Sequence, residues 1–234
     1  MKQAIHEINY QFIFKGKEKN LSYTVQVDAN PKAIASEKPA QCPDWTLLEF
    51  KQCPECPLKP KSHPVCPAAY AIKDIVNDCK TLLSFQEVEL KVNFANRSIE
   101  CKTQVQDALS SLLGLVLANS ACPRFEFFRP MAYFHLPLAT AEETMFRVLS
   151  SYLLAAYFQG KVSSGVDLDP LYAIYHQLQT VNTHLAKRIE SLSEGDATQN
   201  AVVLLHLLSC ILPETLDHTL HDLRPLFKTL SLKP

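Results

Sequence analysis

The sequence predicts an α+β fold: a four-stranded antiparallel sheet made of two hairpins and packed on helices, followed by an all-helical C-terminal half. Two segments, residues 6–28 and 87–102, alternate apolar and polar residues with a period of two, as half-buried strands do. Segments with helical periodicity and helix-start residues follow each hairpin. After the second hairpin only helical patterns recur, which separates strands from helices along the chain.

The first predicted hairpin has two strands joined by a short polar segment. Each strand has an apolar residue at every second position: Ile8, Tyr10, Phe12, Phe14, Leu21, Tyr23, Val25 and Val27. Residues 16–20 lie between them and contain a glycine, so we expect the turn there. This alternation gives the hairpin one buried face and one solvated face.

The second predicted hairpin repeats the pattern later in the chain. Its first strand carries apolar residues at Val88, Leu90, Val92 and Phe94, and its second strand runs from Ser98 to Lys102. Asn96 and Arg97 form the expected turn between them. Because one hairpin is barely stable in water, we expect both to join in one sheet whose apolar face is covered by helices.

Two helices are predicted in the first half of the chain. Pro67 suits the first turn of a helix that ends near Leu83. Thr103 with Gln106 forms a capping-box pattern directly before a second apolar-periodic segment that begins at Val105. These two helices are the expected cover of the sheet.

Three helix-start signals divide the C-terminal half: Thr140 with Glu143, Asp169 before Pro170, and Asp196 with Gln199. The periodicity after each signal predicts helices over residues 141–159, 170–191 and 197–212. Pro213 is expected to end the last of them.

We expect a single domain over residues 1–234 with two subregions. Residues 1–120 hold the sheet, two helices and a loop rich in cysteine and proline at residues 30–66, and residues 121–234 form a helical bundle. The irregular stretch 119–137 separates the two subregions. Its many aromatic residues predict that it is packed against the rest of the chain.

Composition excludes several classes of partner. The 234 residues include 23 Lys and Arg against 24 Asp and Glu, so bulk charge cannot attract a nucleic acid. Five glycines are too few for the glycine-rich loops that hold nucleotide phosphates. The N-terminus lacks the apolar stretch of a signal peptide, and residues 112–118 are far shorter than the ~20 needed for a membrane helix. We therefore expect a cytoplasmic protein and leave a protein partner open.

Half of the eight cysteines lie close together in the sequence. Cys42, Cys53, Cys56 and Cys66 fall within 25 residues, and Cys53 and Cys56 have the two-residue spacing of a metal knuckle. Cys66 precedes a predicted helix start, where the helix dipole favours a thiolate. These four residues are the predicted metal ligands, with His63 as an alternative fourth ligand.

The nature of the cysteine cluster stays open at this point. Zinc is the expected metal, since four thiolates suit its tetrahedral coordination. An iron–sulfur cluster is the alternative cofactor, because Cys-Pro pairs are also found beside such clusters. The third alternative is four buried thiols without a metal. Cys79, Cys101 and Cys210 lie on apolar faces and are expected to be core residues.

A second group of candidate residues lies after the second predicted helix. The candidate binders of an acidic ligand are Arg124, Arg129, His135, Glu143 and Arg147. The alternative is structural: the arginines pair with Glu126, Glu142 or Glu143 and hold an irregular loop in place. We expect the structural outcome, since nothing at fixed spacing marks a known pocket.

The sequence leaves open whether the protein is an enzyme, and it favours a protein without catalytic activity. Cys122 and His135 could form a nucleophile pair, but the segment lacks an obvious set of oxyanion donors. No other catalytic arrangement is recognisable in the sequence.

Several ordered motifs together resemble an uncharacterised family of bacterial proteins. The motifs are Asp44–Leu47, Cys53–Leu58, Cys66–Ala69, Arg129–Ala132 and Phe134–Pro137. The resemblance covers roughly residues 45–200 and implies a bacterial cytoplasmic protein. It also implies that the cysteine loop and the loop around Arg129–Met131 are characteristic features of the family. It implies no catalytic residue.

The leading functional hypothesis is a metal-stabilised binding or regulatory protein, with zinc as the metal. The alternative is an iron–sulfur redox protein, or an enzyme with a pocket under residues 122–135.

Overall fold

The computed structural model describes residues 6–16, 20–28, 36–161, 167–190, 192 and 194–228. Three expectations fall outside these residues: the centre of the first hairpin turn at residues 17–19, the beginning of the cysteine- and proline-rich loop at residues 30–35, and the helix end at residue 191.

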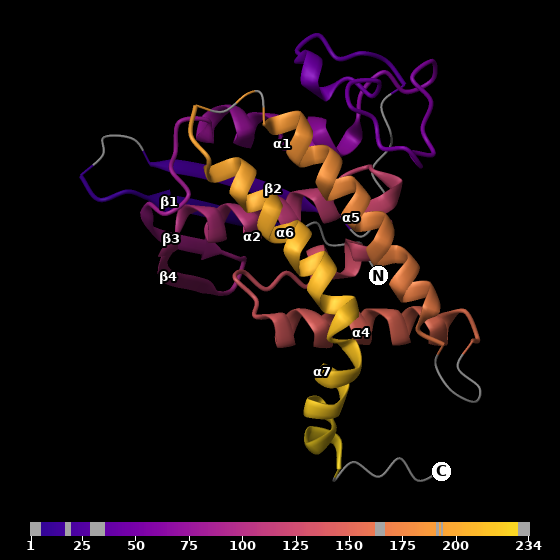
Figure 1. The fold of residues 1–234 in the computed structure, drawn as a ribbon. Helices are drawn as coiled ribbons and strands as arrows, with labels where there is room; N and C mark the ends of the chain where they lie inside the picture. Colours follow the sequence, from indigo (N-terminus) through magenta and orange to yellow (C-terminus); the bar gives the residue numbers. More distant parts are fainter. Residues whose placement is uncertain are drawn as a thin grey trace.

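The sheet confirms the predicted α+β fold. Its strands are β1 (His6–Ile13), β2 (Leu21–Val27), β3 (Glu87–Asn93) and β4 (Ser98–Gln104), in the spatial order β2-β1-β3-β4 (Figure 1). All neighbours are antiparallel, and β1 joins the two hairpins by pairing with β3. Tyr10 of β1 lies opposite Tyr23 on one side and Val92 on the other. The alternating side chains of β1 thus place Tyr10 on the buried face.

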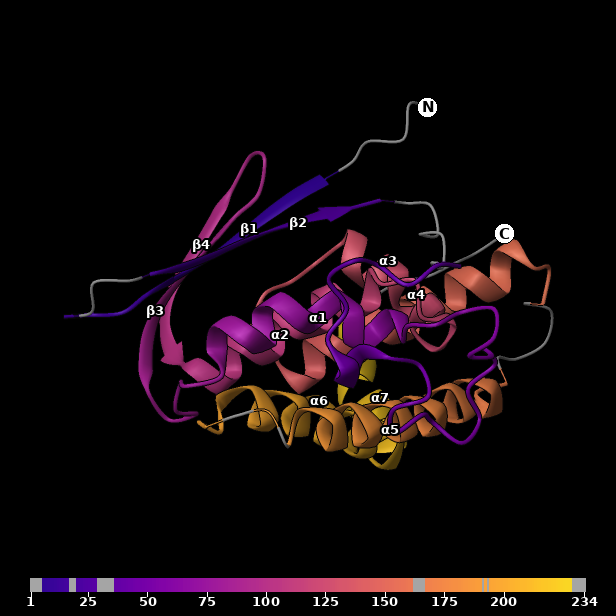
Figure 2. The ribbon, with the colours of Figure 1, turned by 90° about the horizontal axis from the view of Figure 1, so that it is seen from above.

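Helices cover one face of the sheet in two successive layers (Figure 2). The first layer contains α1 (Pro67–Cys79) and α2 (Val105–Ala118), and the second contains α5 (Asp169–Ile189) and α6 (Ala197–Glu214). The remaining helices are α3 (Arg129–Tyr133), α4 (Ala141–Phe158) and α7 (Leu216–Leu223), with short 3-10 helices at Asp44–Thr46, Pro123–Phe128 and Arg224–Phe227. One core cluster joins the layers, since it contains Ile8 of β1, Leu112 of α2 and Val202 of α6.

The local helix-start signals had different outcomes. The capping box at α4 is confirmed: Glu143 N donates to Thr140 Oγ1 at 3.2 Å, and Thr140 N donates to a Glu143 carboxylate oxygen at 2.8 Å. The capping box predicted at Thr103 is wrong. Thr103 belongs to β4, which continues directly into α2, and the N–H groups of Val105 and Gln106 donate to backbone carbonyls outside the helix.

Three further boundaries differ from the prediction. Asp169 lies inside the first turn of α5 and is not its N-cap, and α1 ends at Cys79 rather than near Leu83. Pro213 does not end α6, which continues to Glu214. A proline within a helix leaves the carbonyl four residues earlier without its usual donor. Here that carbonyl belongs to Ser209, and it accepts a hydrogen bond from Gln179 Nε2 at 2.9 Å.

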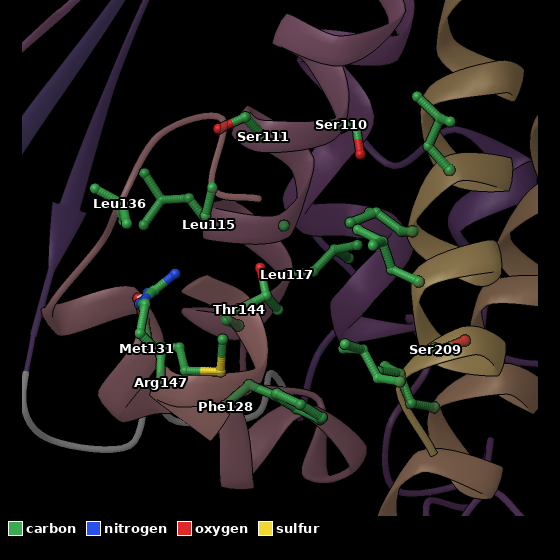
Figure 3. Close-up of a pocket in the computed structure, with 18 of the residues that line it drawn as sticks. Ser110, Ser111, Leu115, Leu117, Phe128, Met131, Leu136, Thr144, Arg147 and Ser209 are labelled. Carbon is green, nitrogen blue, oxygen red and sulfur yellow. Dashed lines mark hydrogen bonds between the residues drawn. The ribbon is translucent and has the colours of Figure 1, made fainter. Parts of the chain in front are cut away.

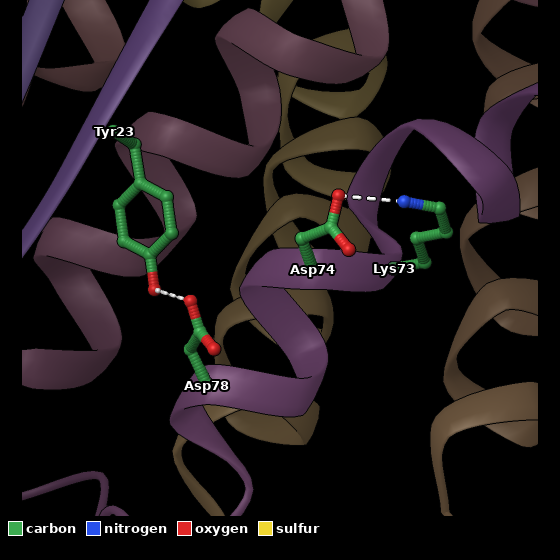
Figure 4. A network of polar contacts seen from close by, with 4 residues as sticks. All are labelled: Tyr23, Lys73, Asp74 and Asp78. Atoms are coloured by element: carbon green, nitrogen blue, oxygen red, sulfur yellow. Dashed lines mark hydrogen bonds and ion pairs between the residues drawn. The ribbon is translucent and has the colours of Figure 1, made fainter. Parts of the chain in front are cut away.

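A tyrosine connects the edge of the sheet to α1 (Figure 4). The Tyr23 hydroxyl donates to an Asp78 carboxylate oxygen at 3.4 Å and lies 3.6 Å from Cys79 Sγ. Burial raises the pKa of Tyr23, so the hydroxyl keeps its proton and remains a donor. One turn earlier on α1, Lys73 and Asp74 form an ion pair at 2.6 Å.

No single helix within the described residues is long and apolar enough to cross a membrane. One pair of segments, Val105–Ala118 and Pro123–Tyr133, has the required length and composition together, with a bend of 109° between them.

Gly195 allows the α5–α6 connection to lie against the turn after α1. Its N–H donates to Lys80 O at 2.7 Å, and a Cβ added to it would lie 2.2 Å from Leu82 O. Because that neighbour is backbone, Gly195→Ala should lower the free energy of unfolding by about 1–3 kcal/mol in urea denaturation. Gly114→Ala is the control, since its Cβ would meet only Leu205 Cδ2 at 3.4 Å. An equal loss in both variants would contradict this account.

Candidate functional site

Four cysteines line one small cavity. Cys53 and Cys56 come from the proline-rich loop, Cys66 directly precedes α1, and Cys122 directly precedes the 3-10 helix Pro123–Phe128. All four are half-buried, and none forms a disulfide. The cavity, which we call the thiol cavity, has a volume of about 20 Å³, enough for about one water-sized particle.

Backbone contacts explain why the loop brings its cysteines together. Cys56 N donates to Cys53 O at 3.1 Å, which closes a tight turn between the two thiols. Cys66 N donates to Thr46 O at 2.8 Å, so the end of the loop pairs with the end of the 3-10 helix Asp44–Thr46. Proline follows both Cys66 and Cys122, where a fixed backbone angle suits the start of a helix.

The group in the cavity differs from the predicted ligand set. Cys53, Cys56 and Cys66 are brought together as expected, but Cys42 does not line the cavity: its Sγ lies 3.2 Å from Thr46 Oγ1. The alternative ligand His63 does not line it either, and its Nδ1 lies 3.0 Å from Ser62 Oγ. Sequence reasoning missed Cys122. A signal was present, since Cys122 is followed by proline like all four loop cysteines, Cys42, Cys53, Cys56 and Cys66.

The side chains are not arranged for coordination as they stand. Among the described residues, no three His, Cys, Asp or Glu side chains form a group ready to hold a metal ion. Burial raises the pKa of the Cys53 thiol to about 11, and the neighbouring Cys66 and Cys56 raise it further. Burial likewise raises the pKa of Cys122 to about 12, with the other three thiols adding to the effect. Without a bound metal ion, the thiols of Cys53 and Cys122 are therefore protonated and neutral.

A buried arginine forms part of the wall of the thiol cavity. Arg188 of α5 is 1% exposed. Its guanidinium donates to three backbone carbonyls of the cysteine loop, those of Trp45 (2.7 Å), Leu47 (2.8 Å) and Leu48 (3.1 Å). No described carboxylate lies within ion-pair distance of it. Burial lowers the pKa of Arg188, and the nearby cysteines oppose that shift. The loop therefore encloses a positive charge beside four thiols.

A second, much larger cavity lies between α2, α3 and α4 on one side and α6 on the other (Figure 3). Its volume is about 630 Å³. Most of its wall is apolar and includes Leu115, Leu117, Phe128, Met131, Leu136 and Leu208. We call it the apolar cavity.

One wall of the apolar cavity carries a chain of polar contacts that reaches into the sheet. His135 Nε2 lies 2.5 Å from the Tyr10 hydroxyl, which in turn lies 2.8 Å from Ser111 Oγ. Ser111 Oγ also accepts from Leu138 N at 3.0 Å. Burial, with a smaller contribution from the Arg147 charge, lowers the pKa of His135 to about 3. His135 is therefore neutral at physiological pH.

Arg147 is the basic side chain in the wall of the apolar cavity. Its Nη2 donates to Met131 O at 2.6 Å and to Phe134 O at 3.1 Å. Burial lowers its pKa, while Glu143 acts in the opposite direction. The Glu143 carboxylate is engaged with the N-cap of α4, and no described carboxylate forms an ion pair with Arg147.

Of the five predicted ligand-binding residues, the structure brings two to the apolar cavity, His135 and Arg147. Arg124 donates to Gln177 Oε1 at 2.6 Å and to the backbone carbonyl of Glu55, and it lines the thiol cavity. Arg129 pairs with Glu126 at 3.7 Å, one of the structural pairings considered from the sequence. Cys122 and His135 line different cavities and do not form the nucleophile pair.

The two cavities share walls. On α5, Val181 lines the thiol cavity and Asn182 the apolar cavity. On the 3-10 helix after Cys122, Arg124 lines the former and Phe125 the latter. A constraint on the thiol cavity therefore also acts on the segments that enclose the apolar cavity.

A family model described as Domain of unknown function (DUF6901) matches residues 8–228. No curated protein and no solved structure matches the chain. The family match agrees with the motif resemblance, which implied a family without an assigned activity.

Proposed function

The chain belongs to the DUF6901 family, and we propose that it is a metal-stabilised binding protein in which Cys53, Cys56, Cys66 and Cys122 bind one zinc ion. The observation that carries the proposal is the convergence of four cysteines, three from one loop and Cys122 from a later segment, on one ion-sized cavity beside a buried arginine. Four thiolates are a common ligand set of structural zinc.

Charge supports a metal among the thiols. A buried charge without a partner is costly, and Arg188 has no described carboxylate beside it. Zinc deprotonates coordinating thiols, so four thiolates and one zinc ion carry a net charge of about −2. This negative group would supply the missing counter-charge. Binding requires the thiol groups to rotate toward a common centre, since no three of the described side chains are arranged to hold a metal ion.

The size of the thiol cavity favours one ion over a cluster. Its volume of about 20 Å³ corresponds to about one water-sized particle. An iron–sulfur cluster adds several iron and sulfide atoms and needs more space. The choice of Cys122 over Cys42 rests on the same cavity, because Cys122 lines it and Cys42 does not.

The metal's role in this proposal is to hold the wall of a binding pocket. Coordination would join the proline-rich loop, the start of α1 and the segment after Cys122. The last of these, together with α5, also encloses the apolar cavity. We place the protein in the cytoplasm, as part of the proposal, because reduced thiols persist there.

Metal content tests the ligand set. Protein purified without oxygen should contain about one equivalent of zinc, because four thiolates complete a tetrahedral site. Cys122→Ser and the double variant Cys53→Ser, Cys56→Ser should lose most of it, whereas the matched control Cys42→Ser should keep it. Elemental analysis of the folded fraction measures this. Chelator should also lower the melting temperature, since a structural metal contributes folding free energy.

Several outcomes would overturn the proposal. Unaltered protein without metal would remove its basis, and brown protein with several equivalents of iron would establish the cluster instead. Loss of zinc in Cys42→Ser, with retention in Cys122→Ser, would refute the ligand set. Should the cysteine variants fail to fold, cobalt substitution of the unaltered protein remains informative, because thiolate ligands give Co²⁺ a distinctive charge-transfer absorption. A cobalt spectrum without it would count against thiolate coordination.

A further inference from the structure

We propose that the apolar cavity binds a small molecule with an extended apolar body and a single carboxylate, and that Arg147 binds the carboxylate. This inference rests on the apolar cavity alone and does not require a metal in the thiol cavity.

The size and lining of the cavity set the kind of ligand. A volume of about 630 Å³ lies within the range of small-molecule pockets. Side chains of leucine, phenylalanine and methionine dominate the wall, so most of the ligand must be apolar to gain from burial there. Polar groups in such a wall fix the orientation of the ligand.

Arg147 supplies a binding group for an anion. Figure 3 shows its guanidinium directed into the cavity from α4, on the same side as Thr144 and across the cavity from α6. Only Nη2 has hydrogen-bond partners among the described residues, the carbonyls of Met131 and Phe134. The N–H groups of Nε and Nη1 therefore remain available to donate to a ligand. A half-buried arginine without an ion pair is stabilised most by an anionic group that accepts hydrogen bonds from both Nε and Nη1.

A carboxylate fits the charges of the wall better than a phosphate. The wall holds one guanidinium, and His135 is neutral because burial lowers its pKa to about 3. Asp107 also lies in the wall and adds a negative charge. A monoanion can pair with the guanidinium of Arg147, whereas a phosphate dianion would add a second negative charge to a wall that holds no further guanidinium for it.

A second polar atom in the wall also lacks a partner. Asn182 of α5 is 1% exposed, and its Oδ1 has no hydrogen-bond partner among the described residues. Buried polar atoms are normally paired, so this amide would gain a partner by turning its oxygen, which is now closed off from solvent, toward a group in the cavity. A donor on the ligand, or a water that accompanies it, would satisfy this acceptor.

The test compares dodecanoate with 1-dodecanol, which have the same chain length and differ in the charge of the head group. In calorimetric titrations of the unaltered protein, below the concentration at which either probe aggregates, dodecanoate should bind at least tenfold more tightly. Arg147→Met should reduce dodecanoate affinity at least tenfold and leave dodecanol affinity unchanged. Arg147→Lys, which keeps the charge, should retain part of the preference. Arg129→Met is the matched control, because Arg129 pairs with Glu126 and does not line the cavity.

The proposal fails if the acid and the alcohol bind the unaltered protein equally well, if neither binds, or if Arg147→Met keeps the preference for the acid. The comparison in the unaltered protein needs no variant, so it decides the question even if Arg147→Met loses structure. Zinc content measured on the same samples separates this result from the metal proposal: a preference for dodecanoate in metal-free protein would support the ligand and refute the zinc site.

Discussion

Arg188→Met will lower the free energy of unfolding by about 3–5 kcal/mol, because each buried carbonyl that loses its donor costs about 1–3 kcal/mol. The guanidinium donates to the carbonyls of Trp45, Leu47 and Leu48, and methionine would leave these buried acceptors unpaired. The substitution also removes the positive charge beside the thiol cavity. Denaturant unfolding measures the loss, and zinc content should fall in the same variant.

The adjacent residue supplies the control for this prediction. Lys187 lies one position earlier on α5 and is exposed, so Lys187→Met should change the free energy of unfolding by less than about 0.5 kcal/mol. Replacing a buried charge by an apolar side chain is sometimes neutral or stabilising. An Arg188→Met protein as stable as the unaltered one would show that the arginine does not hold the loop in place.

The second large effect is a loss of stability in acid that depends on His135. Its pKa falls from 6.5 to about 3 on folding, mainly because the ring is buried and secondarily because Arg147 is close. The unfolded chain therefore binds a proton that the folded chain does not bind between these two values. Stability contributed by the neutral ring is complete above pH 6.5 and is lost as the pH falls toward 3, by roughly 4–5 kcal/mol in total.

Variants separate this effect from general acid denaturation. His135→Gln removes the titrating group but keeps hydrogen-bonding atoms for Tyr10, so its free energy of unfolding should fall less steeply between pH 6.5 and 4. His218→Gln is the control, since the His218 side chain is 81% exposed and the slope should not change. Denaturant unfolding at several pH values measures the slopes. Identical slopes in the unaltered protein and His135→Gln would refute the assignment.

The elements that were predicted correctly are those fixed by residues close in the sequence. Period-two alternation located all four strands, and the capping box at Thr140 involves residues three positions apart. The predicted helix ends and capping hydrogen bonds differ from the structure where a residue distant in the sequence supplies the hydrogen bond. Asp196 is the N-cap residue of α6, as predicted, and only its hydrogen bonds differ: its carboxylate accepts from Ser84 N at 2.7 Å and Ser84 Oγ at 2.9 Å and not from the first turn of the helix. Pro213 is tolerated in α6 because Gln179 of α5 provides the missing donor.

In the candidate sites, too, residues close in the sequence were placed correctly and contacts between distant residues were missed. The spacing of Cys53 and Cys56 is local and correctly placed them together. Cys122 joins them only through the packing of the 3-10 helix against the loop, which a spacing rule does not include. Arg188 gives no signal at all, because a single arginine in an amphipathic helix is usually exposed. His135 and Arg147 stood out by composition, but the Tyr10 partner of His135 lies 125 positions away.

The pairing of β1 with β3 affects how the chain acquires its structure during synthesis. The hairpin of β1 and β2 has local contacts, so it can form early, but by itself it is barely stable in water. The free edge of β1 stays unpaired until β3, which begins at Glu87, has been synthesised. The apolar face of the hairpin stays uncovered until α2, which ends at Ala118, has been synthesised. Until then Ile8 and Phe12 face water, next to an open strand edge that could pair with another chain. Until β3 and α2 are in place, the hairpin of β1 and β2 therefore exposes both an apolar face and an unpaired strand edge.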